Sequence, residues 1–156
     1  MLEIRRYREA DHDAIWALHN LALAPTGAHL GNGLWDDDLH HIETAYLSSG
    51  GDFLVGIYDD QIVAMGALER TTRVRAEIKR MRVHPDYQRW GFGQSMLVHL
   101  ESRARELGYT DVHLETTTLQ KAAQQLYLKH GYREIGRKRV GPFDVIVYEK
   151  NLTNRA

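Results

Sequence analysis

The amino-acid sequence predicts an α+β fold of three layers, in which helices cover both faces of a mixed β-sheet. A strand, two helices and a hairpin come first, a strand–helix–strand unit follows, and a helix and a second hairpin end the order. The 156 residues, of which 43% are hydrophobic, can build the core of such a fold. We therefore expect one domain over residues 1–156.

Strands are predicted where residues alternate or form short apolar runs between turn signals. These segments are residues 2–7, 53–58, 61–69, 75–83, 112–116, 134–140 and 143–151. Asp59-Asp60 and Gly141-Pro142 mark tight turns, so two pairs of strands are expected to form hairpins.

Helices are predicted by apolar residues at helical spacing. The first follows possible capping groups at residues 9–11, the second opens at residues 36–38, the third ends at Gly108 and the fourth covers residues 119–130. Their expected inward residues are Ile15, Trp16, Leu18, His19 and Leu21, then Leu39, Ile42, Ala45, Tyr46 and Leu47, then Met96, Leu97, Leu100, Ala104 and Leu107. The connection from residue 83 to 112 should be a right-handed parallel crossover, which puts the third helix's N-terminus beside the end of a strand.

The most informative segment is the junction from Val83 to Ser95, with the sequence VHPDYQRWGFGQS. It predicts a strand end, a short loop with two glycines and the start of a helix. Main-chain amides at such a junction are free of helical hydrogen bonds, and the helix dipole adds positive charge. Gly91 and Gly93 let phosphate oxygens approach, and Arg89 adds a forked cation. The segment therefore predicts a pyrophosphate cradle.

This segment carries a family resemblance. Residues 88–93, QRWGFG, match the Q/R-x-x-G-x-G/A signature of the GCN5-related N-acetyltransferases (the GNAT superfamily), which bind acetyl-coenzyme A through its pyrophosphate. Upstream, residues 76–83 resemble that family's central strand. Downstream, residues 126–132, LYLKHGY, resemble the run that closes the cofactor site. The resemblance covers nearly the whole chain.

The resemblance implies a mostly antiparallel, twisted sheet whose central strands splay into a V. Acetyl-CoA would be the co-substrate, and the main chain at Met81 and Val83 would hydrogen-bond its pantetheine arm like an added strand. The implied cofactor-binding residues are Met81, Arg82, Val83, Gln88, Arg89, Trp90, Gly91, Phe92, Gly93, Gln94, Ser95, Gln120, Ala123 and Tyr127. Gln120 stands where many family members have asparagine, and its longer side chain leaves a direct contact open.

Glu77 is the candidate general base, because an alkylamine with a pKa of about 10.4 must lose a proton before it attacks a thioester. Alternation along the strand predicts that Glu77 shares a face with Lys79, Met81 and Val83. Family members that acetylate protein lysines have a carboxylate at the matching place. Whether Glu77 acts directly or through water stays open, as does a structural role in an ion pair with Lys79 or an arginine.

Tyr127 is the candidate general acid, since the resemblance puts its hydroxyl near the thioester sulfur. A thiol has a pKa of about 8.5, so its thiolate is already a fair leaving group. The rate gain expected from protonation by Tyr127 is therefore modest. The alternative is a tyrosine of the core. Main-chain N–H groups near residues 81–83 are candidate donors to the oxyanion.

The composition narrows the class of protein. The formal net charge of −1 gives no general attraction to nucleic acids or anionic membranes, and the absence of cysteine excludes an acyl-enzyme on a thiol. With no apolar leader or membrane span in sight, we expect a cytoplasmic protein. His40-His41 point to different sides of a helix, so we expect no metal. Dimers are common among similar proteins, so a homodimer is compatible with the sequence.

Two other functions fit parts of the sequence. A dinucleotide-binding oxidoreductase would fit Gly91-Phe92-Gly93 after a strand, but Met96 occupies the third glycine position. A non-catalytic acyl-CoA sensor would keep the cradle without Glu77 and Tyr127. The expected reaction is transfer of an acetyl group to the primary amine of a small molecule or peptide.

The resemblance puts the acceptor pocket at His29, Trp35, residues 36–38 and residues 139–143. The three aspartates could attract a cationic amine or could cap a helix.

Overall fold

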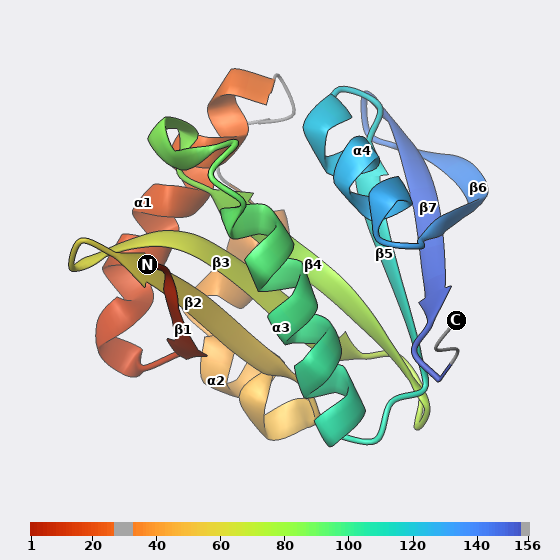
Figure 1. Cartoon of the computed structure of the whole chain (residues 1–156), viewed down its shortest axis with the longest axis horizontal. Coiled ribbons are helices and arrows are strands. Elements are labelled where there is room, and N and C mark those ends of the chain that lie inside the picture. Colours follow the sequence, from red (N-terminus) through yellow and green to blue (C-terminus); the bar gives the residue numbers. More distant parts are fainter. Residues whose placement is uncertain (27–32, 154–156) are drawn as a thin grey trace.

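The structure is a computed structural model, which describes residues 1–26 and 33–153. One seven-stranded sheet has the order β1-β2-β3-β4-β5-β7-β6; β4 and β5 are parallel, and the other neighbouring pairs are antiparallel. The strands, shown in Figure 1, are β1 Glu3–Arg6, β2 Asp52–Tyr58, β3 Gln61–Arg70, β4 Arg75–Val83, β5 Asp111–Thr117, β6 Arg133–Val140 and β7 Phe143–Asn151.

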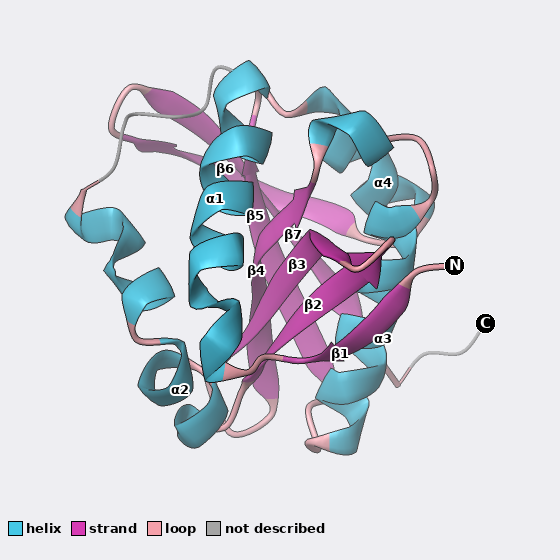
Figure 2. Ribbon diagram, turned by 90° about the vertical axis from the view of Figure 1, so that its left-hand side faces the viewer, coloured by secondary structure: helices cyan, strands magenta, loops and turns pink. Residues whose placement is uncertain are grey.

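Helices cover both faces of this sheet (Figure 2). The α-helices are α1 His12–Leu23, α2 Ile42–Ala45, α3 Phe92–Glu106 and α4 Lys121–Lys129, and the 3₁₀ turns are η1 Glu9–Asp11, η2 Ala24–Thr26, η3 Leu34–His40, η4 Leu47–Ser49 and η5 Pro85–Tyr87. Helices α1 and α2 lie on one side, and α3 and α4 lie on the other. The predicted α+β class, with a mixed and mostly antiparallel sheet, is confirmed. No helix in the described ranges is long and apolar enough to cross a membrane.

The two faces bury separate apolar clusters. Beneath α1 and α2, the fully buried Ile15 and Ile42 pack with Phe53 of β2. Beneath α3 and α4, side chains such as Leu100 pack on the opposite face of the same strands. A Cβ added to Gly66 of β3 would lie 2.6 Å from Cδ1 of Leu100, so the glycine lets α3 approach the sheet closely.

Some details of the predicted helices are wrong. The segment from Asp36 forms the 3₁₀ turn η3 and the one-turn α2 rather than one helix, because Asp36 and Asp38 bind a side chain of β4 instead of capping. Asp11 likewise pairs with Arg5 and does not cap α1. Leu21 is 48% exposed on the outer face of α1.

A β-bulge interrupts β4 in the middle of the strand. Lys79 pairs with Ala67 and Arg82 pairs with Met65, so two residues of β4, at positions 80 and 81, oppose the single residue between these partners on β3. Arg80 adopts the left-handed region with a φ of 59°. The extra residue reverses which face the following side chains occupy.

The bulge therefore corrects one prediction. Met81 and Val83 pack against the cluster beneath α3, as do Ala76 and Ile78 on either side of Glu77, whereas the cross-strand partners of Lys79 and Arg82 belong to the cluster beneath α1 and α2. Glu77 does not share a face with Met81 and Val83, because strict alternation ends at Arg80.

The predicted V between the central strands is confirmed. β4 and β5 pair only from Arg75–Asp111 to Ile78–Leu114, and beyond that point the strands separate. β5 stays paired with β7 as far as Thr117. In Figure 1 the upper part of β5 leans with β7 and α4 away from β4 and α3. The sheet thus opens where β4 leads into the glycine-containing loop.

Candidate active site

A cleft of about 540 Å³ occupies the opening of the V. Every residue predicted to bind the cofactor lines it except Trp90 and Ser95. The other lining residues come from α1, the loop before α3, α3 itself and the start of α4: Ala22, Leu23, Tyr87, Met96, Leu119, Lys121, Ala122 and Leu126. Segments far apart in the sequence, which the resemblance assigned to one cofactor, therefore meet at one place.

The first turn of α3 presents free amides beside this cleft. Ser95 N donates to the carbonyl oxygen of Gly91 at 3.0 Å, which is the first hydrogen bond of the helix. The amides of Phe92, Gly93 and Gln94 have no partner among the described residues. Gly91 has a φ of 82°, which suits a residue without a side chain at this turn. Free amides and the helix dipole fit the diphosphate of coenzyme A.

Two residues predicted to bind the cofactor, Trp90 and Ser95, lie outside the lining of the cleft. The amide of Ser95 is already used by the helix. Trp90 turns its ring away, against Tyr58, Tyr87 and Phe92, at centroid distances of 5.4, 5.1 and 5.8 Å. This aromatic cluster packs the loop together, with Tyr87 and Phe92 in the lining of the cleft and Tyr58 and Trp90 outside it.

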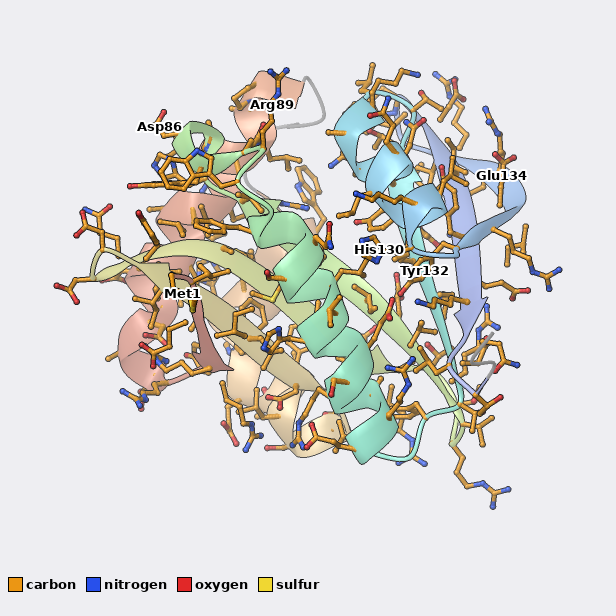
Figure 3. The ribbon with its side chains drawn as sticks, viewed as in Figure 1. Met1, Asp86, Arg89, His130, Tyr132 and Glu134 are labelled. Atoms are coloured by element: carbon orange, nitrogen blue, oxygen red, sulfur yellow. The ribbon has the colours of Figure 1, made fainter. Side chains whose placement is uncertain are left out.

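Arg89 lies at the tip of the same loop, where Figure 3 shows it near the start of α3. Its side chain is exposed, its φ is 71°, and it has no ion pair among the described residues. His84, at the beginning of the loop, accepts a hydrogen bond from the amide of Asp86 on Nδ1 at 3.1 Å. His84 is therefore a turn-forming residue at the start of η5.

Tyr127 stands on α4 at the inner wall of the cleft and is 5% exposed. Its ring packs against Tyr132 and Tyr148 at 5.8 and 5.9 Å. The hydroxyl makes no hydrogen bond to any described residue. Burial raises the pKa of Tyr127 to about 12, although the charge of Arg82 acts in the opposite direction. The hydroxyl is thus protonated at neutral pH and available as a donor.

Gln120 lines the cleft, but its side-chain oxygen is occupied. It accepts hydrogen bonds from the amide and hydroxyl of Thr117, both at 3.1 Å, and from the hydroxyl of Thr116 at 3.2 Å. The side chain therefore ties the N-terminus of α4 to the end of β5. Only its Nε2 donors remain for a ligand.

Glu77 lies on β4 just below the opening of the V and is partly buried. It makes no ion pair or hydrogen bond within the described part of the chain, and Lys79 pairs instead with Glu69 at 3.7 Å. The suggested pairing of Glu77 with Lys79 is therefore wrong. Burial raises the pKa of Glu77 above its ordinary value; Lys79 opposes this, and Glu115 and Glu69 add to it. Glu77 does not line the 540 Å³ cleft.

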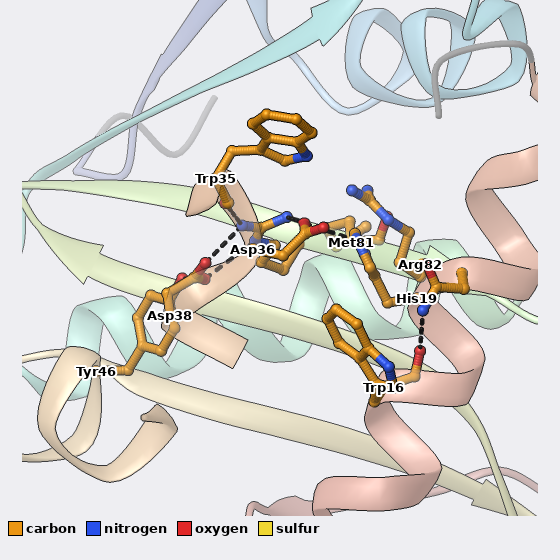
Figure 4. Close-up of polar contacts among 10 residues, drawn as sticks. Trp16, His19, Trp35, Asp36, Asp38, Tyr46, Met81 and Arg82 are labelled. Carbon is orange, nitrogen blue, oxygen red and sulfur yellow. Dashed lines mark hydrogen bonds and ion pairs between the residues drawn. The ribbon is translucent and has the colours of Figure 1, made fainter. Parts of the chain in front are cut away.

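A buried network holds the bulge against η3, as Figure 4 shows. Nε of Arg80 donates to Asp38 Oδ2 at 3.0 Å, and Nη2 donates to Asp38 Oδ1 at 2.5 Å. Nη1 of Arg80 lies 3.3 Å from Asp36 Oδ1. The Tyr46 hydroxyl also donates to Asp38. Asp36 and Asp38 are therefore engaged by Arg80 and do not cap a helix, whereas Asp37 between them is exposed.

His19 belongs to this network and was assigned only to the helix core by its spacing. Its Nε2 lies 3.0 Å from Asp36 Oδ1, and the ring is 1% exposed. Burial and the charges of Arg82 and Arg80 lower the pKa of His19 to about 4, although Asp36 opposes them. The imidazole is therefore neutral at physiological pH.

The remaining predicted acceptor residues occupy the surface or lie outside the described residues. His29 is among the latter. Trp35 is 59% exposed, and Asp37 is exposed. In the predicted 139–143 turn, Arg139 pairs with Asp144 at 3.2 Å. His40 contacts His12 at 2.9 Å.

The sequence matches the profile of the Acetyltransferase (GNAT) family over residues 10–132. The chain belongs to the GNAT family. N-acetyltransferase 8F1 of Rattus norvegicus is 31% identical over 106 residues, which are 65% of this chain and 48% of that protein. This GNAT chain therefore spans about half the length of that curated relative.

Solved structures resemble the whole fold. A GNAT-family acetyltransferase of Staphylococcus aureus Mu50 has a TM-score of 0.89 at 24% identity, covering 97% of this chain and 99% of that one. The PaiA N-acetyltransferase of Thermoplasma acidophilum, solved in complex with coenzyme A, has a TM-score of 0.79 at 17% identity, with coverages of 97% and 99%. These likenesses show the GNAT fold.

We predict that Asp38→Asn destabilises the protein by about 1–3 kcal/mol at pH 7, because Arg80 loses a charged acceptor in a buried network. Asp37→Asn, in the same turn but exposed, is the matched control and should change stability little. Urea unfolding measures both variants; equal stability of the two would contradict the role of the network.

The effect should also depend on pH. Burial alone would raise the pKa of Asp38, but the hydrogen bonds and charge of Arg80 outweigh it and lower that pKa below the ordinary 3.8. A carboxyl with a lowered folded-state pKa stabilises the fold fully above its unfolded pKa, and the gain is lost as pH falls through the folded value. The difference between Asp38→Asn and the wild type should therefore persist down to about pH 4 and shrink below it.

Proposed function

We propose that this chain is an acyl-CoA-dependent N-acetyltransferase that moves the acetyl group of acetyl-CoA to a primary amine of a small molecule or peptide. The observation that carries the proposal is the cleft in the V, where free amides of α3, the diverging edge of β4 and the Tyr127 hydroxyl meet. Membership of the GNAT family and a coenzyme A complex of a protein with the same fold support it.

The residues fit coenzyme A at two places. The amides of residues 92–94 and the charge of Arg89 would hold the diphosphate, while the unpaired edge of β4 beyond Ile78 would bind the pantetheine arm. Bound acetyl-CoA supplies an activated thioester. A Cβ added to Gly93 would lie 3.7 Å from Val83 and 3.6 Å from Leu126. The larger side chain in Gly93→Val or Gly93→Ile would therefore extend toward these two residues.

The chemistry is direct attack in a ternary complex. The amine nitrogen forms a bond to the acetyl carbon, the carbon–sulfur bond breaks, and the products are an amide and a thiol. The proton lost by the amine passes to Glu77, and the thiolate takes a proton from Tyr127. Because Glu77 is not in the wall of the cleft, we propose that its proton transfer runs through water.

Incubation with acetyl-CoA and a panel of amines, with detection of free thiol, tests the proposal. The expected result is amine-dependent thiol release and calorimetric binding of coenzyme A. Binding of coenzyme A without release with any amine would favour the alternative, a non-catalytic acyl-CoA sensor. Binding of reduced nicotinamide cofactors, with no binding of coenzyme A, would favour an oxidoreductase.

Tyr127→Phe should lower kcat by about 10- to 100-fold, because the leaving thiolate loses its proton donor. The affinity for coenzyme A and the melting temperature should stay unchanged, since the hydroxyl has no hydrogen-bond partner among the described residues to lose. Tyr58→Phe, outside the cleft, is the control. A parallel loss of stability and turnover would instead make Tyr127 a structural residue.

Glu77→Gln should lower kcat at neutral pH by about 100-fold, because the base is removed. A base acts only when deprotonated, so wild-type kcat should rise with pH through the raised pKa of Glu77, and this acid limb should vanish in the variant. Exposed Glu106→Gln is the control for loss of a carboxylate. A pH–rate profile that keeps its acid limb in Glu77→Gln would remove Glu77 from the mechanism.

A further inference from the structure

Arg82 occupies an unusual position at the base of the V. The bulge turns its side chain toward α1, where it lines the cleft together with Ala22 and Leu23. Its neighbours along the strand, Met81 and Val83, pack on the opposite face. Figure 4 shows the arginine beside His19 and Met81. Arg82 therefore belongs to the side of the sheet away from the α3 amides.

Arg82 makes no ion pair with a described residue, although the charges of Asp36 and Asp38 act on it from farther away. Nη1 donates to the carbonyl oxygen of Met81 at 2.8 Å, which is a neutral acceptor. Nε is buried without a hydrogen-bond partner, and Nη2 makes no hydrogen bond to a described residue. By contrast, Arg80 takes both nearby carboxylates, Asp36 and Asp38. The segment 27–32, GAHLGN, contains no acidic residue that could serve instead.

This arrangement calls for an anion from outside the chain. A buried cation without a partner is costly, and a ligand that supplies the counter-charge removes that cost. Burial and the charge of Arg80 lower the pKa of Arg82 to about 10, so the group is still charged at neutral pH. His19 is neutral there and adds no competing charge.

The phosphates of coenzyme A are poor candidates for this anion. The free amides of α3 and Arg89 lie at the loop end of the cleft, on the face that Met81 and Val83 share with α3. Arg82 instead neighbours Tyr127, closely enough that each charge affects the pKa of the other. An anion on Arg82 would therefore belong to the acceptor.

We propose that the acceptor is a free amino acid or a close relative, and that Arg82 binds its carboxylate and so presents the amine to the thioester. The Nη groups of the guanidinium would pair with the carboxylate through charge-assisted hydrogen bonds. Arg82 is then a specificity-determining residue rather than a catalytic one. This inference rests on the proposed acetyltransferase function and narrows its substrate class.

The test compares the proteinogenic L-amino acids with their α-carboxamides, which keep the amine and lose the charge. Wild-type kcat/KM should favour the free acids by at least about tenfold, since a site built for a charged group rejects the analogue that lacks it. Arg82→Gln should abolish this preference by raising KM for the acids while leaving KM for the carboxamides little changed, and Arg82→Lys should restore part of it. Arg73→Gln, on the exposed β3–β4 turn, is the matched control.

A second measurement is independent of turnover. Calorimetry with protein saturated with coenzyme A should detect binding of the preferred amino acid to the wild type and weaker binding to Arg82→Gln, with coenzyme A affinity equal in both.

A wild-type kcat/KM for carboxamides equal to or above that for the free acids would overturn the inference. This measurement uses the wild type alone, so it does not depend on whether a variant folds. An equal rise of KM for acids and carboxamides in Arg82→Gln would also overturn it. If amines without a carboxylate are acetylated and amino acids are not, only the substrate inference fails. If no amine releases thiol, the proposed function itself fails.

Discussion

The ion pair between Arg80 and Asp38 is the interaction on which the geometry of the site depends. It joins residues 42 positions apart and holds an arginine in the left-handed region, a conformation that side chains other than glycine rarely adopt. The bulge that results inserts one residue into β4 and exchanges the faces of everything after it. Without it, Arg82 would face α3 and Met81 would face α1.

The bulge also gives the cleft two walls of different chemistry, one on the α3 side and one on the α1 side. On the α3 side, an apolar wall that includes Val83 leads to free amides at the helix start, which suits a long cofactor with a charged diphosphate. On the α1 side, the wall includes the charged Arg82, and η3 is tied to the same strand through Asp36 and Asp38. The sheet opening connects the two sides because β4 and β5 stop pairing at Ile78. A donor and an acceptor could thus approach from opposite faces.

Local patterns were sufficient for much of this structure. The strands, the hairpins and the glycine-containing helix start depend on short-range spacing, and the sequence predicts them closely. The bulge could not be predicted in this way, because no glycine or proline marks Arg80 and its conformation depends on η3, far away in the chain. Ion pairs with Arg80 are also why Asp36 and Asp38 do not cap a helix. The hydrogen bonds of Gln120 could not be predicted either. Its side-chain oxygen accepts from the hydroxyls of Thr116 and Thr117, and the spacing of residues along the chain does not identify these partners.

The proximity of Arg82 and Tyr127 bears on how a thiolate would be protonated. A tyrosine with a pKa of about 12 is a weak acid toward a thiolate whose thiol has a pKa of about 8.5 in water. Burial raises the pKa of a thiol as it does that of a phenol, so inside the cleft the gap between the two groups narrows. Arg82 lowers the pKa of Tyr127 against the effect of burial, and an anion bound to Arg82 would weaken that help. Tyr127 would then act mainly by hydrogen-bonding the thiolate as it leaves, with complete proton transfer following as the thiol moves toward water.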